Sequence, residues 1–222
     1  MVDPGQLALQ VNQHLLAFYG HAEWRTPLPA VDELVSTILS QNTNDINRDR
    51  AFNALRERFP VWEEACKASP DEVVSAIRPA GLSNQKGPRI QLVLQQILEE
   101  RGSLELGFLK DWPIEKSRAW LTRFKGVGPK TAAIVLLFSL GLPAFPVDTH
   151  IYRVTGRIGL LPERMNVEDA HDHLEKLFPP ESYYDVHLNL IRLGREICTA
   201  RRADCYKCPL QVVCNYAQKL NI

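Results

Sequence analysis

The stretch Phe124-Lys125-Gly126-Val127-Gly128-Pro129-Lys130-Thr131 decides how this sequence folds. A helical pattern ends at Phe124, and residues 130 to 140 are apolar on every side, as in a helix buried within a protein. Gly126 and Gly128 allow positive φ and close backbone approach, and Pro129 is suited to the first position of a helix. The pattern predicts a helix–hairpin–helix whose outward-facing amides can bind a phosphate. By itself, a plain turn between two helices would explain the glycines equally well.

Lys130 falls in the first turn of the buried helix, where its amine is a candidate nucleophile. The plainer alternative is a lysine that reaches solvent or a phosphate. Asp148, in Pro146-Val147-Asp148-Thr149-His150, fits the N-cap of a helix over 151–158, and capping alone could explain it. A carboxylate beside a nucleophilic amine would also hold the amine and stabilise positive charge on a substrate.

Four of the five cysteines, Cys198, Cys205, Cys208 and Cys214, are spaced C-x6-C-x2-C-x5-C. Structural zinc sites usually have two separated C-x2-C pairs, whereas this spacing contains one, so it favours a [4Fe–4S] cluster over the zinc alternative. Disulfides are not expected, because no secretory signal is visible. Cys66 lies on a predicted helix and is expected to be a buried structural thiol.

The composition excludes several classes of protein. Of 222 residues, 45% are hydrophobic and 23% are charged, which excludes a disordered tail. No apolar run approaches the roughly 20 residues that a membrane span needs. Helical periodicity recurs along the chain, including a capping box at Ser69-Pro70-Asp71-Glu72, and sustained period-two alternation is missing. We therefore predict an all-α fold of about ten helices in a cytoplasmic protein.

The formal net charge is zero, but the basic residues are unevenly distributed. Between residues 116 and 130 the chain has five basic residues and no acidic one, and between 192 and 208 it has five basic residues and two acidic ones. Such a run is usually a solvated face. Because one run overlaps the hairpin and the other overlaps the cysteines, both are candidates for contact with nucleic acid.

Together, these motifs resemble the endonuclease III family of helix–hairpin–helix DNA glycosylases with AP lyase activity. The resemblance is carried by Gly126 to Ala132, by Val147 to His150 and by the cysteine spacing, and it extends from about Val31 to Cys214. It implies a six-helix barrel domain at 27–142, a second helical domain at 1–26 and 143–222 that carries the [4Fe–4S] cluster, and a DNA-binding cleft between them. A monomer acting on double-stranded DNA with damaged bases or abasic sites, in the nucleoid of a prokaryotic-type cell, is then expected.

The resemblance also implies roles for single residues. Lys130 would attack C1′ of an extruded nucleotide, release an oxidised pyrimidine and form a Schiff base, after which β-elimination cuts the strand. Asp148 would stabilise the positive charge that develops on the sugar. The expected DNA-contacting residues are Asn42, Leu82, Lys125, Gly126, Val127, Gly128, His150, Arg153 and Arg201.

The sequence departs from the family pattern at two positions. Lys125 stands where proline is usual, and Asn42, within Ser40 to Asp45, stands where glutamine is expected and is one methylene shorter. Leu82 matches an apolar wedge that enters the duplex, with a core leucine as its alternative. Two other functions stay open: a mismatch (thymine or uracil) glycosylase, whose family members commonly have Tyr or Ser at the position of Lys130, and a non-catalytic DNA-binding protein.

Overall fold

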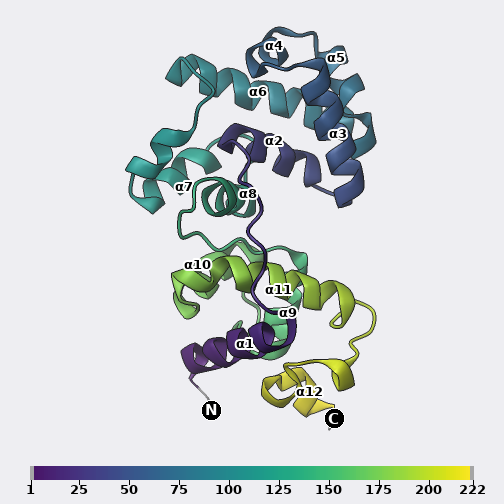
Figure 1. Cartoon of the computed structure of the whole chain (residues 1–222), viewed down its shortest axis with the longest axis vertical. Coiled ribbons are helices and arrows are strands. Elements are labelled where there is room, and N and C mark those ends of the chain that lie inside the picture. The colour runs from purple at the N-terminus through teal and green to yellow at the C-terminus, as the bar shows by residue number, and fades with distance from the viewer. Residues whose placement is uncertain (1–2, 221–222) are drawn as a thin grey trace. The chain divides into compact units, whose positions relative to one another are not determined.

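The computed structural model describes residues 3–220, and α-helices dominate this range (Figure 1). The predicted all-α class is confirmed, although these residues form twelve α-helices rather than about ten, with short 3₁₀ and π turns between them. The only extended pairing within them is an isolated bridge between Cys198 and Ala203. No described helix is both long and apolar enough to cross a membrane. The described residues divide into two compact units, one of which is Pro27–Leu142, and the other is formed by the segments that precede and follow it.

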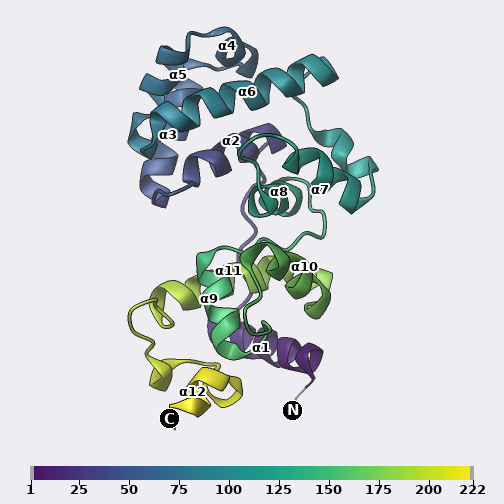
Figure 2. The same ribbon diagram turned by 180° about the vertical axis from the view of Figure 1, so that it is seen from behind.

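The unit Pro27–Leu142 is built around α2 and the segment of α8 and η3. Both are almost entirely buried, and α2 packs against α3, α6, α8 and η3. In both views α8 is seen along its axis, beside α2 and α7 (Figures 1 and 2). The elements of this unit are α2 (Ala30–Ser40), α3 (Asp45–Arg58), α4 (Trp62–Lys67), α5 (Pro70–Ala76), η1 (Arg78–Ala80), α6 (Ser83–Arg101), η2 (Gly107–Asp111), α7 (Ile114–Thr122), α8 (Pro129–Ile134) and η3 (Val135–Ser139).

Local sequence accounts for the ends of these helices. Ser69 accepts a hydrogen bond from the Glu72 amide while the Glu72 side chain accepts from Ser69, so the predicted capping box at the start of α5 is confirmed. α7 ends at Thr122, two residues before the predicted Phe124. The buried helix predicted over 130–140 is an α-helix only to Ile134 and continues as the π-helical turn η3. Its burial is as predicted.

The second unit has its own apolar core, in which Phe145 is stacked on Phe178 with ring centroids 5.5 Å apart and meets Tyr183 edge-on. α11 packs against α1 and α9, so the N-terminal helix belongs to the same core as residues far along the chain. The elements of this unit are α1 (Pro4–Tyr19), α9 (Thr149–Ile158), α10 (Val167–Leu177), η4 (Pro180–Ser182), α11 (Tyr183–Glu196), η5 (Cys205–Lys207), η6 (Gln211–Val213) and α12 (Asn215–Lys219).

Candidate functional site

The predicted hairpin connects α7 to α8 in the unit Pro27–Leu142. Gly126 has φ of 89°, which favours glycine, as predicted. Gly128 has φ of −92° and ψ of −179°, an extended conformation, so Gly126 uses the positive φ that glycine allows and Gly128 does not. It is the N-cap of α8, and a Cβ built on it would meet no atom within 4 Å. The surface at Gly128 is therefore open. Because glycine has no side chain, another molecule can approach the backbone closely at this position.

Two residues that the sequence did not single out hold this hairpin. Gln41 donates from Nε2 to the Gly126 carbonyl oxygen at 3.0 Å, and Arg89 Nη1 donates to Gln41 Oε1 at 2.9 Å. The Arg89 side chain also fills the space that a Cβ on Gly126 would occupy. Gln41 precedes Asn42 in the loop predicted to contact DNA, so the loop and the hairpin are joined. The only sign in the sequence that Gln41 belongs to the site is its position next to Asn42.

The lysines of the hairpin lie in different surroundings. Lys125 is exposed, and Lys130, in the first turn of α8, is half-buried. Among the residues that the structure describes, no hydrogen bond or ion pair engages the Lys130 amine. The Val127 side chain is buried, with 3% of its surface exposed, so Val127 can offer a ligand only its backbone groups.

Asn42 and Leu82 lie on two loops of the same unit and share an unusual conformation. Their φ angles are 53° and 50°, in the left-handed region. Asn42 is exposed, and 48% of the Leu82 surface is exposed. The alternative that Leu82 is a core residue is therefore wrong. An exposed leucine in a conformation that leucine rarely adopts is consistent with a functional side chain.

In the second unit, Asp148 caps α9 as predicted: its Oδ1 accepts from the Ile151 amide at 2.8 Å. The preceding segment is held by two buried histidines that the sequence did not single out. His187 Nδ1 donates to the Pro146 carbonyl at 2.9 Å, and His171 Nδ1 lies 3.2 Å from the Val147 amide nitrogen. The half-buried Asp148 carboxylate is thus fixed in position by the cap and by the segment that leads to it.

This unit also contains three candidate DNA-contacting residues, and they differ in how far their side chains are free to bind a ligand. Arg153 donates from Nη2 to the Gly194 carbonyl at 2.8 Å and from Nε to the Cys198 carbonyl at 3.1 Å. Its guanidinium therefore joins α9 to the end of α11. His150 Nδ1 lies 3.2 Å from the same guanidinium, while Arg201 is exposed.

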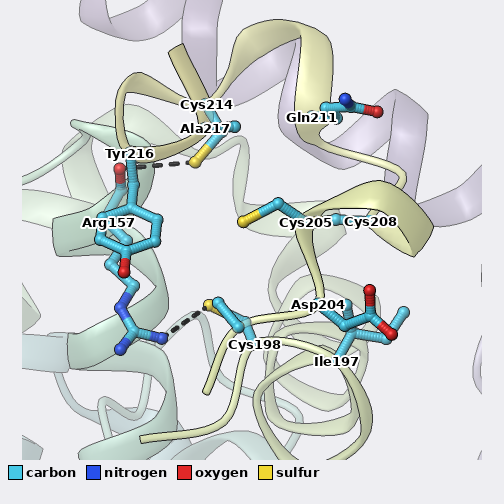
Figure 3. A pocket seen from close by; sticks show the side chains of 11 residues that line it. Arg157, Ile197, Cys198, Asp204, Cys205, Cys208, Gln211, Cys214, Tyr216 and Ala217 are labelled. Atoms are coloured by element: carbon cyan, nitrogen blue, oxygen red, sulfur yellow. Dashed lines mark hydrogen bonds between the residues drawn. The ribbon is translucent and has the colours of Figure 1, made fainter. Parts of the chain in front are cut away.

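The four C-terminal cysteines line one cavity (Figure 3). The sulfur atoms of Cys198, Cys205 and Cys214 point into the same space. Arg157, a further residue that the sequence did not single out, borders the cavity and donates from Nη1 to the Cys198 sulfur at 3.3 Å. No three His, Cys, Asp or Glu side chains between residues 3 and 220 are grouped closely enough to hold a single metal ion. The fifth cysteine, Cys66, is buried on α4, as predicted.

The cavity disfavours free thiolates. Burial raises the pKa of the Cys208 thiol to about 11, and the neighbouring cysteines add to the shift. Burial also raises the pKa of Cys205, with further contributions from Cys214 and Cys198. Thiolates brought together in this way need a compensating cation, and soft thiolate donors select zinc, copper(I) or iron–sulfur clusters. The chemistry of these four donors is thus that of a site for a soft metal or a metal cluster, although the side chains are not grouped around the position of a single ion.

Comparison with known proteins identifies the family of the chain. The model of the HhH-GPD superfamily base excision DNA repair proteins matches residues 35–180. The chain is 35% identical to an endonuclease III of Sulfolobus acidocaldarius over 82% of this chain and 80% of that protein. It is 37% identical, over 76% of its length, to a protein of Arabidopsis thaliana named as a candidate DNA glycosylase, and it spans 57% of that longer protein.

The fold agrees as well. A solved structure of an endonuclease III trapped as a covalent intermediate with DNA is 25% identical and matches with a TM-score of 0.82, over 100% of both chains. A sequence match over most of the chain and a fold match over all of it lead to the same family. The chain belongs to the HhH-GPD superfamily and is an endonuclease III-like DNA glycosylase of base excision repair.

Proposed function

We propose that this glycosylase is bifunctional: it excises oxidised pyrimidines from double-stranded DNA and then cuts the strand as an AP lyase, with Lys130 as the nucleophile. The observation that carries the proposal is the position of Lys130. It is the second residue of α8, which begins immediately after the Gly126–Gly128 turn, and no partner for its amine is found among the described residues. The endonuclease III that matches in fold was itself trapped covalently on DNA, which supports the same chemistry here.

The reaction needs an amine, because only a nitrogen nucleophile can both displace the base and form an imine. A bond forms between Lys130 Nζ and C1′ of an extruded nucleotide while the bond from C1′ to the base breaks. The attached amine then loses one proton and O4′ of the sugar gains one, so that the C1′–O4′ bond breaks and the ring opens. A protonated Schiff base between Nζ and C1′ remains. Loss of a C2′ proton and cleavage of the C3′–O bond then cut the strand on the 3′ side.

Asp148 stabilises the positive charge that develops on the sugar in this mechanism. Its Oδ1 is already held by the Ile151 amide, so the carboxylate is oriented before substrate binds. A preorganised charge contributes more than one that must reorient during the reaction. Asparagine at this position would keep an acceptor for the helix cap and remove the charge, which makes Asp148→Asn a specific test.

DNA is bound mainly by the hairpin and by the exposed cations. The backbone amides of Gly126, Val127 and Gly128 bind a phosphate, and Lys125 adds a positive charge in place of the usual proline. Arg201 and His150 contact the backbone from the second unit. Leu82 enters the stack where the nucleotide has been extruded, and Asn42 approaches the unpaired base.

We also propose that Cys198, Cys205, Cys208 and Cys214 hold a [4Fe–4S] cluster. Four thiols that line a common cavity would hold such a cluster through their sulfur atoms. Bound in this way, residues 198–214 would form a closed loop that supports Arg201. Arg153 supports the same loop through the Cys198 carbonyl, and its role in contacting a phosphate stays a prediction.

Borohydride reduction tests the proposal, because it converts a Schiff base into a stable covalent complex with DNA. The parent chain is expected to form this complex with an abasic duplex, and Lys130→Gln is expected to form none and to cut no strand. Lys125→Gln is the matched control: it removes a charge from the same hairpin and should weaken binding while retaining the trapped complex. Trapping by Lys130→Gln would contradict the assignment. Base excision by the parent chain without any trapped complex would instead indicate a mismatch-type glycosylase.

A further inference from the structure

Lys86, on α6, is one of the largest fully buried side chains among the described residues, with 2% of its surface exposed. Its Nζ donates to the Leu39 carbonyl and to the Ala80 carbonyl, each at 2.8 Å. Burial, assisted by the nearby Arg89, lowers the pKa of Lys86. Lysine is rarely buried so completely, because its charge loses the stabilisation of water. A methionine would fill a similar volume without that cost, so the two hydrogen bonds need an explanation.

The two carbonyls belong to the roots of the two DNA-facing loops. Leu39 lies in the last turn of α2, three residues before Asn42. Ala80 ends η1, two residues before Leu82. These segments are about forty residues apart in the sequence. One ammonium group therefore links the bases of the two loops whose tips are Asn42 and Leu82.

Both loop tips are in the left-handed conformation, which strains leucine more than asparagine. In the part of the chain described, three non-glycine residues have positive φ, namely Asn42, Leu82 and Arg164. Two of these three therefore lie on the loops that Lys86 joins. Such conformations persist only where the surrounding structure enforces them, and they concentrate at functional sites.

We propose that Lys86 is a positioning residue that holds the loops of Asn42 and Leu82 in one fixed arrangement, so that both side chains enter the DNA duplex together. The inference rests on the function proposed above for the two loops. Lys86 touches no DNA in this arrangement; it acts through the carbonyls of Leu39 and Ala80. Nucleotide extrusion depends on filling the gap in the stack at the right moment, so a loop displaced by a fraction of an ångström should slow it.

Two substrates separate this role from a general loss of stability. Excision of a paired oxidised pyrimidine in a duplex requires the loops to enter the stack, whereas cleavage at an abasic site in single-stranded DNA does not. Lys86→Met is expected to slow the first reaction by about ten-fold or more under single-turnover conditions, and the second by no more than about two-fold. The ratio of the two rates, rather than either rate alone, is the result that tests the role.

The chain offers a matched control on the same helix. Gln91 is also buried, and its Nε2 donates to the Ala65 and Ala68 carbonyls at 3.0 Å each. Gln91→Met removes a donor from two backbone carbonyls, as Lys86→Met does, but these carbonyls lie at the end of α4, away from both loops. It should lower stability while leaving the ratio of the two rates unchanged.

Hydrogen exchange in the absence of DNA provides a readout that does not depend on activity. Lys86→Met should speed exchange of the amides in both segments 40–45 and 78–83, and Gln91→Met should speed it in neither. If Lys86→Met does not fold, Lys86→Gln serves instead, because its shorter side chain keeps an N–H donor group, and it should show a smaller change in the same two segments.

Several results would overturn the proposal. A change in only one loop, or equal slowing of both reactions by Lys86→Met, would leave Lys86 as an ordinary structural residue. An unchanged ratio together with unchanged exchange would exclude any coupling. A parent chain that neither excises bases nor cuts abasic DNA would contradict the proposed function, and hydrogen exchange would still decide whether Lys86 joins the loops.

Discussion

Replacing Gly126 by alanine should lower stability through two effects that the structure separates. At φ of 89° an L-residue is disfavoured by roughly 1–2 kcal/mol. The new Cβ would also overlap Arg89, whose Cζ lies 2.9 Å from it, so the Arg89 side chain must move. Moving it breaks the bond to Gln41 Oε1, which is worth about 1 kcal/mol for a partly exposed pair. The expected loss is about 2–3 kcal/mol, or about 5–10 °C in Tm for a chain of this size.

Thermal and urea unfolding followed by circular dichroism measure this loss. In an Arg89→Ala background the clash with Arg89 no longer exists, so the same glycine substitution should cost only the backbone part, roughly 1–2 kcal/mol. The difference between the two backgrounds therefore isolates the contribution of the Arg89–Gln41 contact. The slope of the free energy of unfolding against urea concentration should be unchanged, because the substitution alters the compactness of neither the folded nor the unfolded state.

Gly128→Ala is the control within the same turn. Its backbone conformation is open to any residue and no atom lies within 4 Å of the added Cβ, so it should cost at most about 1 kcal/mol, as an altered N-cap. It should nevertheless weaken binding to an abasic duplex in a fluorescence anisotropy titration, because the methyl group blocks the phosphate. If Gly128→Ala lowered stability more than Gly126→Ala does, positive φ at Gly126 could not be the main cause of the loss. Normal DNA binding by Gly128→Ala would refute close phosphate approach.

Asp148→Asn should retain the parent Tm while slowing base excision by about 10²–10³-fold, as measured in single turnovers. Leu82→Ala should slow excision of a paired lesion far more than cleavage of an abasic site, and equal losses would indicate a folding defect instead. As isolated, the protein should contain about four iron atoms and absorb near 400 nm, whereas Cys208→Ser should lose iron and DNA affinity; stoichiometric zinc would contradict the cluster. Hydrogen bonds from Ser69 hold the pKa of Glu72 below its usual value. The stability that these bonds contribute is therefore fully present when the pH is above the usual pKa of glutamate, and it is lost as the pH falls through the lower pKa of the folded state. An NMR titration should place the Glu72 midpoint below 4.5 and show it rising in Ser69→Ala.

Local sequence was sufficient for the features that depend on a few consecutive residues. The all-α class follows from helical periodicity, and the Ser69 and Asp148 caps follow from side chains that reach the amide three residues ahead. The hairpin follows from glycines and a proline at fixed offsets. Each of these features is governed by backbone geometry within one turn of helix, so the order of residues alone determines it.

Tertiary structure decided the features that join distant segments. Gln41 and Arg89 brace a hairpin far from them in sequence, and Lys86 joins two loops by hydrogen bonds to backbone carbonyls. Every residue has a carbonyl, so no pattern of residue types marks which one a buried donor will reach. Tertiary structure also decided that Arg153 forms hydrogen bonds within its own unit, and that the backbone of Gly128 is extended. Residue types identified the groups that this protein can use for its chemistry, and three-dimensional packing decided which of them are free and which are held.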